Sequence, residues 1–271
     1  MGVPVRPRLA VPSGTWSNSH PALLLRETQN RIDMYSIMIA AAVLPAVFLG
    51  LYIWRKDPHP EPFRWVFRAF LLGMVICMPV ATIEQYIHYF LFGEGEPTTL
   101  LGSTTMAFFV AALPEEGVKL FALWLFLKRC PEYDEDFDCI VYAVFISLGF
   151  ATVENIGYVL MSGEAWMSTA VMRALLAVPG HYAFAILMGF YYAIYAFVDP
   201  SRKNAWKILL VPFAAHGVYD SIAMSGSVDP IAASVCTIVL IYFCVKLQKG
   251  ASQKISDMIA QNKRNQPERK A

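Results

Sequence analysis

Long runs of apolar residues alternate with short polar connections along most of this chain. The hydrocarbon core of a membrane is about 30 Å thick, so a helix needs about 20 apolar residues to cross it. Seven segments meet that length, namely 36–54, 66–92, 101–127, 137–161, 181–198, 206–224 and 230–247. The pattern therefore predicts an all-α polytopic membrane protein, built as a bundle of seven transmembrane helices.

A further apolar stretch, 165–178, is too short to span a membrane as a helix. Its length corresponds to about 21 Å of helix, and Arg173 lies within it. Its apolar side chains recur on one side at helical spacing, which is typical of a short interfacial or re-entrant helix. An eighth span is the alternative. We expect Arg173 to extend to the membrane surface.

The distribution of Lys and Arg favours seven crossings over eight, because cytoplasmic loops carry an excess of both residues. Seven crossings place the basic loops and the C-terminal tail in the cytoplasm, and leave the loops 93–99 and 225–229, which hold no Lys or Arg, outside. Eight crossings would put Arg202, Lys203 and Lys207 outside together with the tail. We therefore expect a polar N-terminal segment 1–35, one transmembrane domain 36–248, and a polar basic tail 249–271 on the cytoplasmic side of the cell membrane.

The composition agrees with a membrane protein. Hydrophobic residues make up 56% of the chain and charged residues 16%, against about 45–50% and about 25% in soluble proteins. The mean hydropathy is +0.45. The formal net charge of +1 gives no field that would attract nucleic acid. These values exclude a disordered or nucleic-acid-binding protein and disfavour an ordinary water-soluble enzyme.

Ionisable residues interrupt four of the predicted spans, although each charge at the centre of a membrane costs about 2.5–3.5 kcal/mol on insertion scales. They are Glu115, Glu116, Lys119, Glu154, His181, His216 and Asp220. If isolated, the group would cost up to about 20 kcal/mol, which exceeds the stability of a typical domain, about 5–15 kcal/mol. We therefore expect these side chains to converge on one another or on water, within a core of about 101–225.

The spacing within each helix indicates which groups pair. Lys119 follows Glu115 by four residues and Glu116 by three, so it can neutralise either carboxylate on its own helix. His216 and Asp220 are also four residues apart, which lets Asp220 hold the imidazole in one tautomer.

Other residues within the spans predict local geometry. Pro114 lacks a backbone donor and should bend its helix beside the glutamates. Gly149 and Gly189 should permit close helix packing. Glu84 and His88, near the end of the second span, we interpret as interfacial.

Such a cluster suits more than one chemistry. A carboxylate near a cation or a metal can activate water, and histidines can donate a proton or stabilise an oxyanion. Glu154, His181 and His216 also form a plausible set of zinc ligands that leaves another glutamate as general base. A proton- or ion-coupled transporter is the alternative function, although the chain shows neither the duplicated halves nor the matched helix breaks typical of transporters.

The motifs on four successive spans resemble the PrsW family of intramembrane peptidases. They are Glu115-Glu116-x-x-Lys119, Phe150-x-x-x-Glu154, His181 and His216-x-x-x-Asp220, and the resemblance covers roughly 106–220. The strings 149–158 and 173–181 are especially similar. The wider CAAX-protease and Abi superfamily carries EExxxR, FxxxH and HxxxN or HxxxD motifs. Here Lys119 replaces the arginine, one residue nearer, and Glu154 replaces the histidine, and both departures favour PrsW.

The resemblance implies an intramembrane endopeptidase, a hydrolase that cleaves membrane-anchored proteins, as in the site-1-type cut of an anti-sigma factor. Its expected partners are such a substrate and the lipid bilayer, with no nucleic acid. Glu115 or Glu116 would activate water, and Lys119 would tune their basicity. Glu154, His181 and His216 would complete a water, metal or oxyanion site, and Asp220 would orient His216. A divalent metal such as zinc and a glutamate-only mechanism both remain open. The seven-crossing topology places the site toward the outer half of the membrane.

Overall fold

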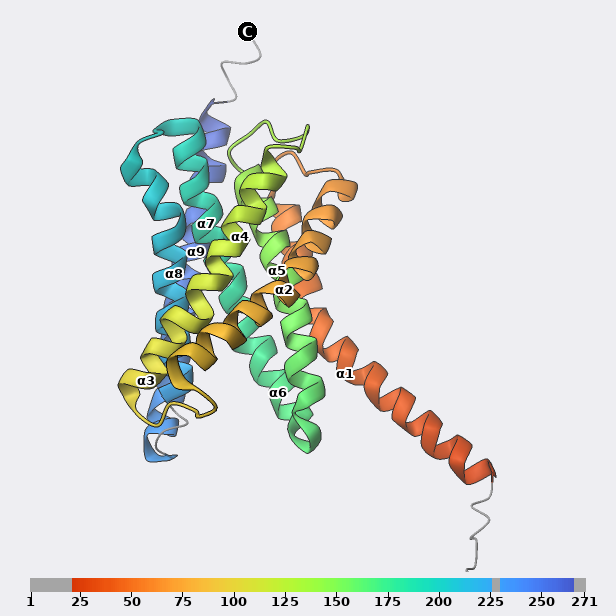
Figure 1. The fold of residues 1–271 in the computed structure, drawn as a ribbon. Helices are drawn as coiled ribbons and strands as arrows, with labels where there is room; N and C mark the ends of the chain where they lie inside the picture. Colours follow the sequence, from red (N-terminus) through yellow and green to blue (C-terminus); the bar gives the residue numbers. More distant parts are fainter. Residues whose placement is uncertain (1–20, 226–229, 266–271) are drawn as a thin grey trace, which may run out of the picture. The chain divides into compact units, whose positions relative to one another are not determined.

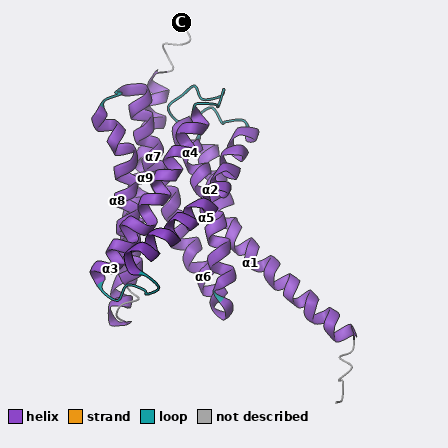
Figure 2. Ribbon diagram, in the orientation of Figure 1, coloured by secondary structure: helices purple, strands orange, loops and turns teal. Residues whose placement is uncertain are grey.

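The computed structural model describes residues 21–225 and 230–265, and every regular element in these ranges is helical (Figure 2). The chain divides into two compact units, 1–37 and 38–271. The described part of the first unit is the beginning of helix α1 (Pro21–Lys56). The N-terminal segment predicted as polar is thus helical from residue 21, and residues 1–20 lie outside the described ranges.

The second unit contains the rest of α1 and all later helices (Figure 1). In two stretches of the chain, successive elements join without a break. The first stretch comprises α3, η1 and α4, and the second comprises η2, α6, η3, α7 and η4. Segments η1, η3 and η4 are π-helical, and η2 is a 3-10 turn. The bounds are α2 (Phe63–Phe92), α3 (Leu100–Thr105), η1 (Met106–Ala112), α4 (Leu113–Leu127), α5 (Asp138–Met161), η2 (Gly163–Ala165), α6 (Trp166–Met172), η3 (Arg173–Ala177), α7 (Val178–Ala193), η4 (Ile194–Val198), α8 (Arg202–Ser225) and α9 (Pro230–Asn265).

Five helices among the described residues are long and apolar enough to cross a membrane, namely 28–56, 63–92, 138–161, 163–198 and 202–225. Each contains or closely overlaps a predicted span. The two other predicted spans, 101–127 and 230–247, are helical as well, but they are not among these five. The all-helical membrane class is therefore confirmed, and the total of seven crossings stays a prediction. The tail predicted from residue 249 is helical to Asn265.

The stretch 165–178 is not a separate interfacial or re-entrant helix, so that expectation is wrong. It belongs to a continuous helix of 36 residues, Gly163–Val198. Directly before Pro179, the N–H of Val178 bonds to the carbonyl of Arg173 five residues earlier, which is the π-helical spacing. Pro179 then stands in the first turn of α7, where a missing donor does no harm. The alternative prediction, that 165–178 forms an eighth span, is not supported either, because this stretch shares one helix with the predicted span 181–198.

Helix α5 lies at the centre of the second unit. In its most apolar window 78% of the residues are buried, against 28% for both α2 and α8, and burial on all sides is typical of a helix that is apolar all round. A Cβ added at Gly149 would lie 2.0 Å from the carbonyl oxygen of Phe70 on α2, and one at Gly189 would lie 2.5 Å from that of Cys139. The predicted close packing at both glycines is confirmed.

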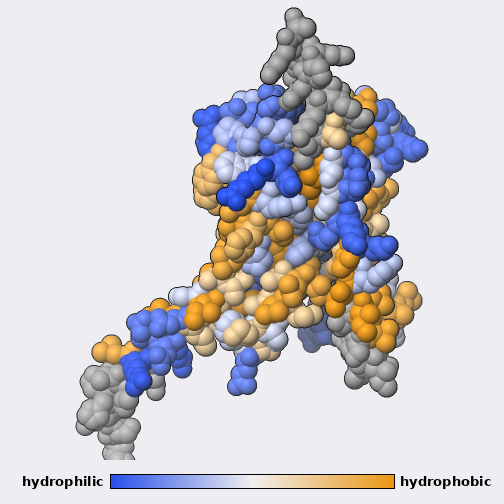
Figure 3. All heavy atoms as spheres, turned by 180° about the vertical axis from the view of Figure 1, so that it is seen from behind, coloured by the Kyte–Doolittle hydropathy of each residue, from blue (hydrophilic) through white to orange (hydrophobic). Residues whose placement is uncertain are grey.

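The outer surface of the helices suits lipid. Apolar side chains predominate over the middle of the face drawn in Figure 3, and hydrophilic side chains gather toward its upper end. On α2 the exposed large apolar residues include Phe67, Val75 and Tyr86. Contiguous apolar surface of this kind is unfavourable in water and is satisfied by the hydrocarbon of a membrane.

Candidate active site

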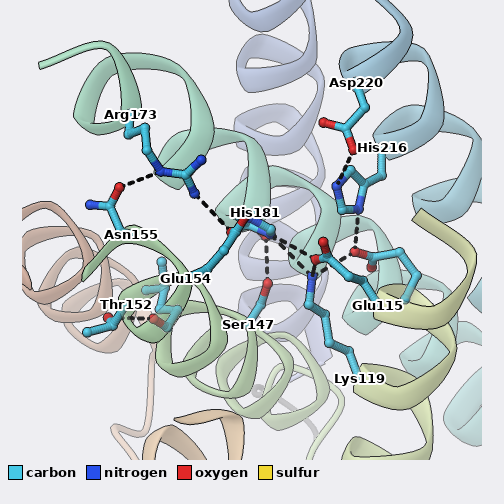
Figure 4. Close-up of polar contacts among 12 residues, drawn as sticks. Glu115, Lys119, Ser147, Thr152, Glu154, Asn155, Arg173, His181, His216 and Asp220 are labelled. Carbon is cyan, nitrogen blue, oxygen red and sulfur yellow. Dashed lines mark hydrogen bonds and ion pairs between the residues drawn. The ribbon is translucent and has the colours of Figure 1, made fainter. Parts of the chain in front are cut away.

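The seven ionisable residues of the predicted site lie on α4, α5, α7 and α8 and form one connected cluster (Figure 4). Five of them are buried, and Glu154 and Asp220 are partly exposed. The expected convergence is confirmed, and with it the explanation of why charged groups are tolerated inside apolar helices. The role of each residue stays a prediction.

Lys119 lies between the two glutamates of its own helix. Its Nζ is 2.7 Å from Oε2 of Glu115 and 3.0 Å from Oε1 of Glu116. The same ammonium is 3.2 Å from Nδ1 of His181 and 4.3 Å from the centre of the Phe150 ring. Because these partners replace the lost hydration of the ammonium, its burial is tolerated.

His181 has a different partner on each ring nitrogen. Nε2 lies 2.8 Å from Oε2 of Glu154, and Nδ1 faces Lys119 and lies 3.9 Å from Oε2 of Glu115. A carboxylate can only accept a hydrogen bond and an ammonium can only donate one. The contacts therefore favour a neutral ring with its proton on Nε2 and a lone pair on Nδ1, directed toward the α4 glutamates.

His216 joins Glu116 to Asp220. Its Nδ1 is 2.9 Å from Oε1 of Glu116 and its Nε2 is 3.2 Å from Oδ2 of Asp220, which confirms the pairing predicted from the spacing. Only a ring that carries protons on both nitrogens can donate to both carboxylates. The ring also stacks on Phe184, with the centroids 4.7 Å apart, so its orientation is fixed by packing as well as by charge.

Arg173 is part of this cluster, which the sequence analysis missed. Its Nη2 forms an ion pair with Oε2 of Glu154 at 2.9 Å, and its Nε donates to Oδ1 of Asn155 at 2.6 Å. The carboxylate of Glu154 thus lies between Arg173 and His181 (Figure 4). The prediction that Arg173 extends to the membrane surface is therefore wrong. The available signal was the rule that a charge within an apolar segment needs a named partner.

The backbone before the glutamates is π-helical. The N–H of Leu113 bonds to the carbonyl of Phe108 five residues earlier, and Pro114 follows at the start of α4. Single π turns are common at functional sites because they rotate the following side chains. Gly217 on α8 contacts this segment so closely that an added Cβ would lie 2.4 Å from the Phe108 ring. The π-helical segment and α8 together bring Glu116 to His216.

The cluster fits a divalent cation. One ligand atom from each of Glu115, Glu116 and His181 lies within 4.8 Å of the others, and Oε2 of Glu116 is buried with no hydrogen-bond partner. Glu154 holds the far nitrogen of His181, as carboxylates commonly do for metal-bound imidazoles. This set shares only His181 with the predicted set Glu154, His181 and His216, which stays a prediction.

Charge gives an independent reason for a cation. The cluster holds four carboxylates, of Glu115, Glu116, Glu154 and Asp220, against two fixed positive charges, those of Lys119 and Arg173. With His181 neutral and His216 protonated on both nitrogens, as their contacts favour, the sum is −1. Excess negative charge is unfavourable in a buried site, so a bound cation would be favoured here.

A cleft of about 1220 Å³ leads to the cluster. Its walls include Glu115, Glu154 and His181 of the cluster, together with Gly93 and Glu96 of the loop before α3. Apolar side chains line much of its length, which suits an extended segment of a membrane-anchored chain. Glu84 and His88, interpreted above as interfacial, also line this cleft.

Comparisons with known proteins extend beyond the motifs. The family model described as PrsW family intramembrane metalloprotease matches residues 61–247, a wider range than the resemblance seen at 106–220. The chain is 42% identical to Protease PrsW of Geobacillus kaustophilus over 189 residues, which is 69% of this chain and 79% of that protein. It is 35% identical to Protease PrsW of Bacillus subtilis over 192 residues, 70% of this chain and 83% of that protein.

No solved structure matches the chain. The family match covers more than half of the chain, and the motifs it was expected to contain occupy one site. The cluster is accordingly the candidate centre of an intramembrane endopeptidase, and the transporter alternative is set aside. This membrane protein belongs to the PrsW family of intramembrane metalloproteases.

Proposed function

We propose that this membrane peptidase hydrolyses a peptide bond of a membrane-anchored protein at the Glu115–Glu116–His181 group. The observation that carries the proposal is the orientation of His181, whose Nε2 is held by Glu154 while Nδ1 faces the glutamates of α4. A structural polar cluster would not need a buried glutamate oxygen without a partner, such as Oε2 of Glu116. That oxygen is free to accept a proton from water.

The chemical step divides between Glu116 and His216. Glu116 takes a proton from the water that attacks the carbonyl carbon, and the carbonyl oxygen becomes negatively charged. When the C–N bond breaks, the proton passes to the leaving amine nitrogen from Glu116 or from His216, which lies 2.9 Å from the same carboxylate. His216, oriented by Asp220, also stabilises the developing oxyanion.

In a metal-dependent mechanism, a divalent metal such as zinc, held by Glu115, Glu116 and His181, would supply Lewis-acid chemistry, and Glu116 would then act as a ligand instead of as the base. The ammonium of Lys119 lies among these ligands, so it balances their charge in the absence of the ion. Metal analysis of the purified protein tests this assignment. We expect about one divalent metal per chain fewer in His181→Ala than in the wild type, and loss of cleavage on chelation. Cleavage that survives complete metal removal would instead support a glutamate-only mechanism.

The substrate we propose is an anti-sigma-factor-like protein with one membrane anchor, cut near the extracytoplasmic face of the cell membrane. Support comes from the family, from the apolar cleft and from the loop residues Gly93, Glu94 and Glu96 that line it. The seven-crossing topology places that loop outside and the C-terminal tail in the cytoplasm.

Co-expression of the protein with such a substrate tests the site. We expect Glu115→Ala, Glu116→Ala and His216→Ala each to lower the yield of cleaved product by at least 100-fold, because general acid–base groups contribute about 10²–10⁴-fold. Glu132→Ala, which removes a surface ion pair with Arg64, is the matched control and should cleave normally. If all three site variants insert normally and cleave at the wild-type rate, the assignment fails.

A further inference from the structure

A second group of carboxylates lies away from the active site. Asp57 lies in the loop between α1 and α2, Glu61 lies just before α2, and Asp138 is the first residue of α5. The three residues are buried, with exposed fractions of 5%, 5% and 0%. Asp138 and Glu154 are 16 residues apart on α5, which corresponds to about 24 Å along the helix. This group is therefore separate from the active site.

The backbone holds the two aspartates in place. Oδ1 of Asp57 accepts from the N–H of His59 at 2.9 Å. Oδ2 of Asp138 accepts from the N–H groups of Asp134 and Glu135 at 3.0 and 2.9 Å. Each aspartate thus uses one oxygen for a local hydrogen bond, which orients its second oxygen without occupying it.

Tertiary contacts hold the glutamate. Oε2 of Glu61 accepts from the hydroxyl of Tyr142, one turn along α5 from Asp138, and the backbone carbonyl of Glu61 accepts from Nε1 of Trp54 at 2.7 Å. Three segments of the chain, the end of α1, the start of α2 and the start of α5, therefore contribute to one rigid constellation.

Buried oxygens in this constellation lack partners. Oδ2 of Asp57 and Oδ1 of Asp138 are inaccessible to solvent and form no hydrogen bond, and one oxygen from each of the three carboxylates lies within 4.8 Å of the others. Throughout residues 21–225 and 230–265, no Lys or Arg forms an ion pair with any of the three. Burial raises the pKa of Asp57 to about 6, and burial together with the neighbouring carboxyl of Asp138 raises that of Glu61 to about 8, because desolvation and nearby negative charge disfavour the ionised forms.

We propose that Asp57, Glu61 and Asp138 bind a divalent cation that prefers oxygen ligands, of the class of Ca²⁺, Mg²⁺ and Mn²⁺. The set offers carboxylate oxygens only, which suit hard cations, whereas zinc sites in proteins favour His and Cys. Oxygens up to 4.8 Å apart can share one ion at the distance of about 2.3–2.6 Å usual for Ca²⁺. The cation would tie the α1–α2 connection to the start of α5, the helix that carries Glu154 further along.

Cation binding is measured on the full-length protein in detergent, in a His181→Ala background that removes a ligand of the active site. After treatment with EDTA, Ca²⁺, Mg²⁺ and Mn²⁺ are titrated separately. We expect at least one of them to bind at about one ion per chain and to raise the Tm by about 5 °C at saturation, since a ligand specific for the folded state stabilises it. The cation with the highest affinity identifies the preferred ion.

Asp57→Asn and Asp138→Asn test the ligands, because asparagine keeps the oxygen that accepts from the backbone and removes the charge. Both variants should lose the cation-dependent rise in Tm. In EDTA, Asp57→Asn should have a Tm equal to or above that of the parent, because one of three repelling carboxylates is gone. If Asp57 had only a structural role, the substitution would lower the Tm. Glu132→Gln is the control. It removes the charge of a carboxylate in the loop before α5 that pairs with Arg64, and it should keep the cation-dependent rise in Tm.

Two results would overturn the proposal. One is the absence of binding and of any Tm shift with all three cations up to about 10 mM, a concentration above the range of weak calcium sites. The other is an unchanged cation response in Asp57→Asn. If Asp138→Asn does not fold, Asp57→Asn decides, since Asp57 lies in a loop and its replacement disturbs no helix.

Discussion

Arg173 acts on the active site through a carboxylate. Its guanidinium pairs with Glu154, and Glu154 in turn holds Nε2 of His181. Arg173 is itself fixed by Asn155, whose amide donates to the backbone carbonyl of Ala42 at 2.8 Å. A continuous series of polar contacts thus runs from α1 to His181, and each member limits the freedom of the next. Arg173 is therefore a positioning residue.

Replacement of Arg173 by Met should impair cleavage, because Met preserves much of the apolar stem and leaves Glu154 without its cation. We expect at least a tenfold fall in kcat with a smaller change in KM, and partial recovery in Arg173→Lys. Rates measured on a purified membrane-anchored substrate check this. Arg64→Met, which breaks an exposed ion pair with Glu132, is the matched control and should be neutral. Equal effects of Met and Lys at position 173 would argue against an electrostatic role.

At the scale of residues, the insertion cost of buried charge was sufficient to predict the cluster. It singled out Glu115, Glu154 and His216 on different helices before any contact was known. The same argument did not find Asp57, which lies in a polar loop, or Asp138, which lies at the end of a predicted span, because charged residues are ordinary in both places. Only the fold shows that these two carboxylates are buried, and burial is what distinguishes them.

At the scale of elements, the contact between α2 and α5 depends on two glycines. A Cβ at Gly73 would lie 1.9 Å from the carbonyl oxygen of Ile146, and one at Gly149 would lie 2.0 Å from that of Phe70. The two backbones therefore touch at reciprocal points, as in other membrane helix pairs with small residues at the interface. Since α5 also carries Glu154 and Asp138, the contact bears on both sites.

The substitution Gly149→Ala should separate α2 from α5 and lower the thermal stability. Overpacking costs about 1–3 kcal/mol, and here the clash is with backbone, which cannot rotate away. Gly157→Ala is a matched control on the same helix, because nothing lies within 4 Å of the added Cβ, and alanine favours helix by about 0.8–1 kcal/mol. Thermal unfolding in detergent should therefore show a lower Tm for Gly149→Ala and an unchanged or higher Tm for Gly157→Ala. The reverse order would refute the packing argument.

The lengths of the apolar runs predicted most helices well but could not predict how the helices join. The π-helical segments before Pro114 and Pro179 have no periodic signature, since they are only seven and five residues long. The stretch 165–178 was therefore predicted as a separate short helix, whereas the π turn before Pro179 lets the chain continue as one helix. The same error separated Arg173 from His181, which that continuous helix carries to one site.

At the scale of the whole molecule, the loops differ in charge according to the end of the helices from which they emerge. The loop 93–99 holds Glu94 and Glu96 and no Lys or Arg, and both glutamates line the cleft. The loop 128–137 begins with Lys128 and Arg129 and leads to Asp138. With seven crossings, the positive-inside rule predicts that the cleft opens outside the cell and that the proposed cation site faces the cytoplasm.

Labelling of single cysteines decides this orientation. In a variant without the five native cysteines, we place one cysteine at Thr98 or at Asp134, two exposed loop positions. An impermeant maleimide applied to intact cells should modify Thr98→Cys, whereas Asp134→Cys should react only after the membrane is opened, because the seven-crossing topology places the two loops on opposite sides. Cleavage activity of the cysteine-free parent shows that it is folded. Labelling of Asp134→Cys but not Thr98→Cys in intact cells would reverse the topology, and the cut would then lie near the cytoplasmic face.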